Sequence, residues 1–403
     1  MSQHRAYPPA VYGPLLALLL LAPRAAVAAY SVHAKAPGTT PANTLAVGFA
    51  HSCMVEPNGD LWCWGNNSAG ELGDGTTIDR HSPHESGPSL TQVLSVSVGG
   101  GHTCAIRRDG SLWCWGDNCD GELGLGHNKC PAHLDPPIST PQQVFPSSTP
   151  VRAVSLGFSH TCAIMHTGKA MCWGWNVTDQ LGIGPKPEQW TPTAVLSEET
   201  WLDISAGFLH TCAVRWDGTA WCWGLGLHGR LGDGKTVFHT ANEPLEANGV
   251  ARAISISAGG AHTCAILRPG GVWCWGNAGL LGDGSNVESG LPVPVSLASA
   301  ATGINAAGDS TCARLANGDI YCWGENWYGQ LGVGNFFDSL VPVKGDLESL
   351  AHAAQVARGG TANHHCISAG GGDVACWGYG GDAHGSPQNR VEELVGNRSI
   401  SHG

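Results

Sequence analysis

Residues 102–116 read "HTCAIRRDGSLWCWG", with Cys104 and Cys114 ten positions apart around an Asp-Gly step and tryptophans on both sides of the second cysteine. The same C-x9-C spacing occurs seven times and accounts for fourteen of the sixteen cysteines. The other six pairs are Cys53 with Cys63, Cys162 with Cys172, Cys212 with Cys222, Cys264 with Cys274, Cys312 with Cys322, and Cys366 with Cys376. A spacing that recurs this often indicates one structural unit used many times.

The repeat is about fifty residues long, because successive first cysteines lie 48 to 58 positions apart. Repeats of this length pack on one another into a single body, so the chain of 403 residues does not require two or three separate domains. We therefore assign residues 45–403 to one domain of seven repeats.

Each cysteine pair is predicted to staple one β-hairpin. A glycine follows the midpoint of every pair, as Gly110 does, and a three-residue hairpin loop needs glycine at that position. This loop sets the register so that the two cysteines face each other with Cα atoms about 4.5 Å apart, within reach of a disulfide. Pro269 occupies the second loop position, where proline is disfavoured, so the fifth hairpin should turn differently. Zinc is the weaker alternative, because metal sites gather cysteines at shorter spacings.

Strand-like sequence continues on both sides of the hairpin. Alternation places Trp113 and Trp115 on one face of their strand and Cys114 on the other, so both faces are expected to be covered. Stretches such as "PTAV" and "PVPV" can add an outer strand, and "AISISAGG" an inner one. About four antiparallel strands per repeat around an axis give an all-β, seven-bladed β-propeller. A linear β-solenoid is the competing fold, but fifty residues are too many for one coil.

The N-terminus predicts export. Residues 1–29 combine basic residues, an apolar run and small residues, which is typical of a secretory signal peptide, and residues 30–44 form a flexible lead-in. The apolar run is too short for a membrane span, so we expect none in the mature chain. Secretion, or a place in the periplasm or at the cell surface, agrees with the even number of cysteines. The net charge of −12 argues against a nucleic-acid partner.

Longer motifs recur around each cysteine pair. "WCWGNNSAGELGDG" (62–75) and "CWGENWYGQLGVG" (322–334), with "GFSHTC" and "GGAHTC" upstream of other pairs, resemble the repeats of the regulator of chromosome condensation family. The resemblance covers residues 45 to about 395 and implies a seven-bladed propeller. The seventh repeat departs from the pattern at "CWGYGGDAHG". The founding activity of that family, nucleotide exchange on a nuclear GTPase, disagrees with a signal peptide and an acidic chain.

The resemblance also extends to exported bacterial members, one kind of which inhibits a secreted hydrolase, and it implies a rigid disc that presents loops to a partner. We expect an exported, monomeric binding module for a macromolecule, most simply a protein, and no enzyme activity. Inhibition of a secreted hydrolase is one alternative; nucleotide exchange or an enzyme site assembled from several blades is another. The chain has no nucleophile elbow, HExxH or phosphate-binding loop, and we expect no cofactor or metal.

Function in a repeat protein is expected where the repeats differ. Trp327 and Tyr328 replace small or polar residues in a turn, Phe336 and Phe337 follow in the next loop, and Trp216 occupies a hairpin tip. Exposed aromatic residues are frequent anchors of protein interfaces, so these five are the predicted partner-binding residues. Packing on a neighbouring blade, where they shield loop backbone, is nevertheless the preferred interpretation.

The second repeat holds the two remaining cysteines, Cys119 and Cys130, which we expect to form an eighth disulfide. That bond either prepares a long loop for a partner or protects it from proteolysis. The acidic "DNCDGE" at 117–122 is compatible with calcium, but turn chemistry is the preferred interpretation.

A histidine stands two positions before the first cysteine in six repeats, and Ser310 interrupts the series. These residues are His51, His102, His160, His210, His262 and His364. A ring of imidazoles can bind a metal, but we favour a structural role in which each histidine satisfies backbone groups of its own blade.

Overall fold

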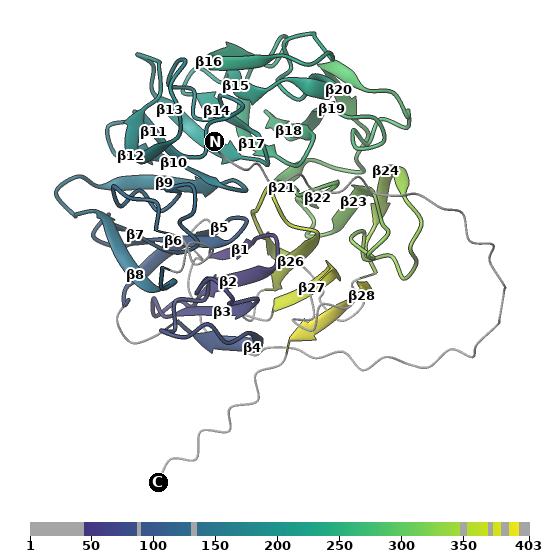
Figure 1. Ribbon diagram of the computed structural model, residues 1–403. Coiled ribbons are helices and arrows are strands. Elements are labelled where there is room, and N and C mark those ends of the chain that lie inside the picture. Colours follow the sequence, from purple (N-terminus) through teal and green to yellow (C-terminus); the bar gives the residue numbers. More distant parts are fainter. Residues whose placement is uncertain are drawn as a thin grey trace, which may run out of the picture.

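The computed structural model describes residues 44–86, 90–129, 135–346, 353–369 and 374–379, together with the backbone of residues 387–394. These residues form seven four-stranded antiparallel sheets, arranged as blades around an axis (Figure 1). The predicted all-β seven-bladed propeller is therefore confirmed. The predicted signal peptide and the lead-in up to residue 43 lie outside the described residues.

In every blade the strands follow one another in chain order from the axis to the rim. The inner strands are β1 (Leu45–Val47), β5 (Val93–Val98), β9 (Val151–Leu156), β13 (Trp201–Ala206), β17 (Ala253–Ala258), β21 (Ala301–Ala306) and β25 (Ala353–Val356). The second strands are β2 (His51–Val55), β6 (His102–Arg107), β10 (His160–Met165), β14 (His210–Arg215), β18 (His262–Leu267), β22 (Ser310–Leu315) and β26 (His364–Ala369).

The third strands carry the second cysteine of each pair: β3 (Leu61–Gly65), β7 (Leu112–Gly116), β11 (Ala170–Gly174), β15 (Ala220–Leu225), β19 (Gly271–Gly276), β23 (Ile320–Gly324) and β27 (Val374–Tyr379). The outer strands are β4 (Arg80–Glu85), β8 (Ile138–Phe145), β12 (Gln189–Ala194), β16 (Thr240–Glu246), β20 (Ser289–Val295), β24 (Ser339–Lys344) and β28 (Pro387–Leu394). A short 3₁₀ turn, η2 (Leu227–Gly229), follows β15. The "PTAV", "PVPV" and "AISISA" segments thus form the outer and inner strands expected of them.

The chain direction gives the disc two different faces. In blade 4, β13 runs towards the short loop before His210, β14 returns to a tight hairpin at Trp216, and β15 runs forward again. Connections after the first and third strands therefore gather on one face, here called the loop face. Tips of the hairpins between second and third strands gather on the opposite face, here called the hairpin face.

The seven C-x9-C pairs are disulfides between directly opposed residues, with Cα atoms 4.1 to 4.2 Å apart. The predicted turn is present in blade 2, where Gly110 has a φ of +82° and donates its N–H to Arg107 O at 2.9 Å. In blade 5 the strand pairing continues to Leu267 and Gly271, one step beyond the last pair of blade 2, so that hairpin does turn differently. Cys119 is also disulfide-bonded, and Cys130 lies outside the described residues.

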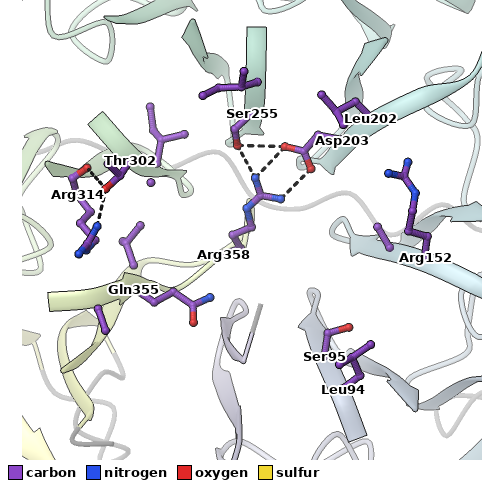
Figure 2. Close-up of a pocket in the computed structure, with 16 residues that line it drawn as sticks. Leu94, Ser95, Arg152, Leu202, Asp203, Ser255, Thr302, Arg314, Gln355 and Arg358 are labelled. Atoms are coloured by element: carbon purple, nitrogen blue, oxygen red, sulfur yellow. Dashed lines mark hydrogen bonds and ion pairs between the residues drawn. The ribbon is translucent and has the colours of Figure 1, made fainter. Parts of the chain in front are cut away.

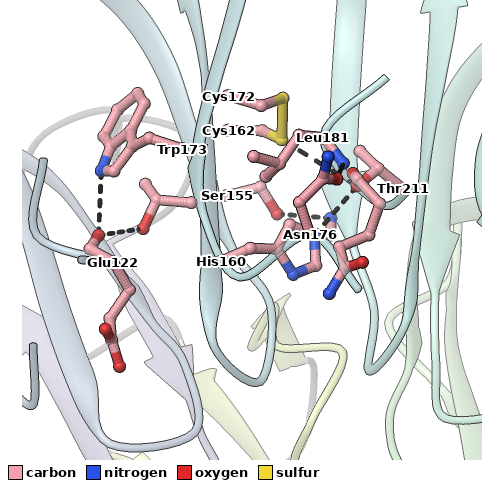
Figure 3. Close-up of a disulfide and its surroundings, with 12 residues drawn as sticks. Glu122, Ser155, His160, Cys162, Cys172, Trp173, Asn176, Leu181 and Thr211 are labelled. Carbon is pink, nitrogen blue, oxygen red and sulfur yellow. Dashed lines mark hydrogen bonds between the residues drawn. A yellow bond between two sulfur atoms is a disulfide. The ribbon is translucent and has the colours of Figure 1, made fainter. Parts of the chain in front are cut away.

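The hydrophobic core lies in layers between neighbouring blades, and Trp173 illustrates how five of these layers are built. Its ring is fully buried, and its indole N–H donates to Glu122 O of blade 2 at 2.9 Å (Figure 3). The ring packs on Gly124, where a Cβ would lie 2.7 Å from the indole nitrogen. The Cys162–Cys172 disulfide lies on the other face of the hairpin, in the layer shared with blade 4. The glycine of each Leu-Gly pair therefore makes room for the next blade's tryptophan.

The histidine series forms a belt of hydrogen bonds between blades, which corrects the expectation that each histidine serves its own blade. His160 Nε2 lies 2.9 Å from Thr211 Oγ1 of blade 4, and that hydroxyl donates to Gln180 O at 2.8 Å. Because the threonine proton is used in this way, the histidine must donate through Nε2. Burial lowers the pKa of His160 to about 3, so its ring is neutral at physiological pH.

The ring closes between blades 7 and 1 without exchange of a strand, because blade 1 is β1–β4 and blade 7 is β25–β28. Val47 N–H donates to Arg358 O at 3.1 Å, and Ala46 forms a parallel bridge with the same residue. Ser52 Oγ and His364 Nε2 lie 2.7 Å apart and continue the histidine belt across the junction. Among the described residues, no helix has the length and apolar character needed to cross a membrane.

Candidate binding site

The loop between β23 and β24 presents the aromatic residues of blade 6 on the loop face. Asn326 holds this loop together from inside: its Oδ1 accepts Leu331 N–H at 2.9 Å, and its Nδ2 donates to Asn335 O and Phe337 O at 2.9 and 3.1 Å. An asparagine buried with these bonds fixes the loop backbone at both ends. The neighbouring aromatic side chains are thus carried on a defined framework.

Four of the five predicted residues belong to this loop and are exposed. Trp327 is 63% exposed and Phe337 80% exposed, while Tyr328 and Phe336 are each a little under half exposed. Tyr328 also packs on Tyr379 of blade 7, with ring centroids 5.0 Å apart. The alternative of packing on an adjacent blade therefore applies to Tyr328, whereas Trp327 and Phe337 remain open to solvent.

Two carboxylates belong to the same loop as the blade 6 aromatic residues and lie next to Asn326. Asp338 Oδ1 accepts Asn326 N–H at 2.8 Å, and Glu325 stands directly before Asn326. Burial, together with the charges of Asp309 and Asp338, raises the pKa of Glu325 to about 7. The site therefore combines exposed rings with an acidic group that changes its charge near neutral pH.

Trp216, the fifth predicted residue, lies on the hairpin face and does not join the other four. It is 61% exposed, and the Arg152 guanidinium lies 5.4 Å from its ring centroid, a cation–π arrangement. The loop of Trp216 follows a second strand and the loop of the other four follows a third strand, and these loops lie on opposite faces because successive antiparallel strands reverse direction.

Three phenylalanines near the axis of the loop face were missed. Phe158 packs edge-on against Phe49 at 5.7 Å between ring centroids and stacks on Phe208 at 5.2 Å. They come from blades 1, 3 and 4, and each precedes its histidine by two positions in "GFAH", "GFSH" and "GFLH". Phenylalanine at a position that is glycine or alanine in other repeats was the available clue.

The acidic loop at 117–122 uses its side chains to cap its own backbone. Asp117 Oδ1 accepts Cys119 N–H at 3.2 Å, and Glu122 Oε2 accepts Asp120 N–H at 2.8 Å. Burial raises the pKa of Glu122 well above its ordinary value. Within the described ranges, no cluster of three or more His, Cys, Asp or Glu side chains is arranged to hold a metal ion. These contacts support the turn interpretation of the segment.

A family model described as the RCC1-like domain matches residues 84–398, and two models of the regulator of chromosome condensation (RCC1) repeat match residues 58–106 and 44–71. The chain belongs to the RCC1-like domain family. The ultraviolet-B receptor UVR8 of Arabidopsis thaliana is 30% identical to it over 344 residues, which are 83% of this chain and 64% of that protein. The mitochondrial RCC1 domain-containing protein RUG3 of the same plant is 32% identical over 238 residues, 58% of this chain and 53% of that protein.

This RCC1-like chain thus spans about half to two thirds of the length of these two relatives. Among solved structures, Prp20p of Saccharomyces cerevisiae superposes with a TM-score of 0.73 at 22% identity, covering 86% of this chain and 88% of Prp20p. Prp20p has been described with its binding to Gsp1p and histones. At this identity the likeness to Prp20p concerns the fold.

Proposed function

We propose that this chain is an exported binding module that holds a protein partner on its loop face, with the blade 6 loop as the anchor. The observation that carries the proposal is the exposure of Trp327 and Phe337 on a loop fixed by Asn326. A loop that is already ordered loses little conformational entropy on binding, and aromatic anchors frequently dominate interface energies.

The charge around these anchors indicates the chemistry of the partner. Glu325 interacts electrostatically with Asp338 of the same loop and with Asp309, which in turn interacts with Arg230. The exposed part of this loop is therefore acidic, which favours a partner surface rich in lysine and arginine. Binding of cations also stabilises the ionised form of Glu325. Prp20p, which binds Gsp1p and histones, supports a role for this kind of propeller in holding other proteins.

Export is part of the proposal and is supported by the seven disulfides, which persist in oxidising compartments. If it is correct, the protein recovered from the medium or periplasm should begin near residue 30. Inhibition of a secreted hydrolase is the narrower version, in which the captured partner is an enzyme whose turnover falls when the module is added.

The test compares Trp327→Ala with Val177→Ala in quantitative capture from the native secreted fraction, followed by titration of the recovered partner. Val177 is a matched control, because Asn176 holds its turn as Asn326 holds the turn of Trp327, and Val177 is likewise exposed. Trp327→Ala should weaken binding roughly thirtyfold and Val177→Ala less than about twofold. Equal effects of the two changes would contradict the proposed anchor.

The pH dependence of binding supplies a second measurement. The pKa of Glu325 is raised to about 7, so this carboxylate loses its charge as the pH falls from 8 to 6. Affinity for a cationic partner should therefore decrease over that range, and Glu325→Gln should remove most of the decrease. A pH profile that is the same in both proteins would exclude this carboxylate from the interface.

A further inference from the structure

A cavity of about 600 Å³ opens at the hairpin face around the propeller axis (Figure 2). Its walls are the first halves of the inner strands of blades 2 to 7, from Leu94 of β5 to Ala354 of β25. This volume lies within the range of cavities that hold small organic ligands in proteins.

The floor of the cavity comes from an extended connection in blade 7. The paired residues Val356 and Ile367 of blade 7 are eleven positions apart, whereas the corresponding pair in blade 4, Ile204 and Ala213, is nine positions apart, so the connection in blade 7 is two residues longer. It carries Arg358 and Gly360 across the axis, where a Cβ on Gly360 would lie 2.2 Å from Ala258 O. On the other side of Arg358 the free space is only about 20 Å³. Among the described residues, the large cavity is therefore closed at that end.

The charges that line this cavity are three arginines and one aspartate. Arg358 holds Asp203 through two parallel hydrogen bonds of 2.9 and 2.8 Å, so this pair is electrically neutral. Within the described part of the chain, no carboxylate lies at ion-pair distance from Arg152 or Arg314. Asp203 also acts on Arg152 at longer range, but three guanidiniums and one carboxylate leave the lining with a net charge of +2 in a protein whose net charge is −12.

Both free arginines are held in place and keep donors available. Arg314 donates to Thr302 Oγ1 at 2.6 Å and to Ala353 O, and Arg152 donates to Trp201 O. A guanidinium has five N–H donors, so each retains some for a ligand. Arg152 belongs to blade 3 and Arg314 to blade 6, and Figure 2 shows them on opposite sides of the cavity.

We propose that this cavity binds a small organic dianion, with one carboxylate held near Arg152 and the other near Arg314. Arginine binds carboxylates through paired hydrogen bonds, and two guanidiniums on opposite walls favour a ligand with an acidic group at each end. Aliphatic dicarboxylates and acidic disaccharides share this chemistry. The site lies on the face opposite the blade 6 loop, so it is independent of the proposed protein interface.

The experiment is a calorimetric titration of the disulfide-bonded chain with succinate, adipate and suberate, with butyrate and sulfate as single-headed anions, and with digalacturonate as the sugar. At least one two-headed ligand should bind saturably, and at least about tenfold more tightly than butyrate or sulfate. Tighter binding of a dicarboxylate would identify the ligand as an aliphatic diacid, and tighter binding of digalacturonate would identify it as an acidic sugar. Absence of saturable binding by all two-headed probes, or equal binding by butyrate, would overturn the proposal.

Variants connect binding to the two arginines. Arg314→Gln and Arg152→Gln should each weaken the best ligand at least about tenfold, whereas Arg108→Gln, on a hairpin tip outside the cavity, should change it less than about twofold. Arg314→Lys keeps the charge and should recover part of the loss. Circular dichroism would show whether Arg152→Gln disturbs folding. If it does, Arg314→Gln and Arg314→Lys still test the proposal. Equal weakening by Arg108→Gln would refute the site.

Discussion

Two joints, meaning contact layers between neighbouring blades, contain equivalent hydrogen bonds made by different residues. They are the joint between blades 2 and 3 and the joint between blades 6 and 7. In the first, His102 Nε2 donates to Thr161 Oγ1 at 2.9 Å, and Thr161 donates to Glu122 O at 2.7 Å. In the second, Ser310 stands in the histidine position and His365 in the threonine position, with Oγ and Nε2 2.9 Å apart. The two partners have exchanged places across the joint.

The exchange also changes how completely the imidazole is satisfied. His102 Nδ1 is buried without a hydrogen-bond partner, whereas His365 Nδ1 lies 3.3 Å from Asn305 Nδ2. Asn305 Oδ1 in turn accepts Gly359 N–H at 2.9 Å, in the segment that forms the cavity floor. The belt therefore keeps its donors and acceptors in the same positions even where the residues differ. In blade 7 the changed residues also hold the longer connection between β25 and β26 in place.

The largest test removes the tryptophan that both joints share. Trp173→Ala and Trp377→Ala should each lower the free energy of unfolding by about 3–5 kcal/mol, because each ring is buried and donates to a carbonyl of the preceding blade. Equilibrium denaturation in urea measures the loss, with Trp327→Ala as an exposed control expected within about 0.5 kcal/mol. A much smaller loss for Trp377 would show that the variant joint is the weaker one.

A swap tests whether the two joints are interchangeable. His365→Thr alone should cost about 1–3 kcal/mol, because it leaves Ser310 and Asn305 with unmatched polar groups in a buried layer. Adding Ser310→His rebuilds the His–Thr contact of the other joints and should recover the part of the loss that comes from Ser310, while Asn305 stays unmatched. Melting temperatures of the single and double variants give the answer, and additive losses would contradict the exchange.

The smallest effect concerns pH. Burial, followed by the charges of His160 and His51, lowers the pKa of His102 to about 3, while the unfolded chain protonates near 6.5. The stability that neutral His102 provides is therefore lost as the pH falls below 6.5 towards 3. His102→Gln keeps a donor and does not titrate. Between pH 6.5 and 5.5 the free energy of unfolding of this variant should therefore rise by about 1 kcal/mol relative to that of the wild type. Identical pH slopes in denaturation would refute this account.

Much of the fold followed from local sequence. The spacing of Cys104 and Cys114 around Gly110 fixed a hairpin, its register and its disulfide, because all three depend on residues within one turn and two strands. For the aromatic residues of the blade 6 loop the sequence favoured packing on a neighbouring blade, which the structure shows for Tyr328, whereas Trp327 and Phe337 are exposed. Trp216 lies on the other face because its loop follows the second strand of blade 4, whereas the blade 6 loop follows a third strand.

The sequence by itself determined the seven repeats, their hairpin staples and the tryptophan layers, because these contacts recur at fixed spacing along the chain. Tertiary structure alone decided the pairing of Arg358 with Asp203, which stand 155 positions apart, and the meeting of Arg152 and Arg314 around one cavity. The physical reason is ring closure: it brings blades distant in sequence to a common axis, and no local pattern records which side chains will meet there.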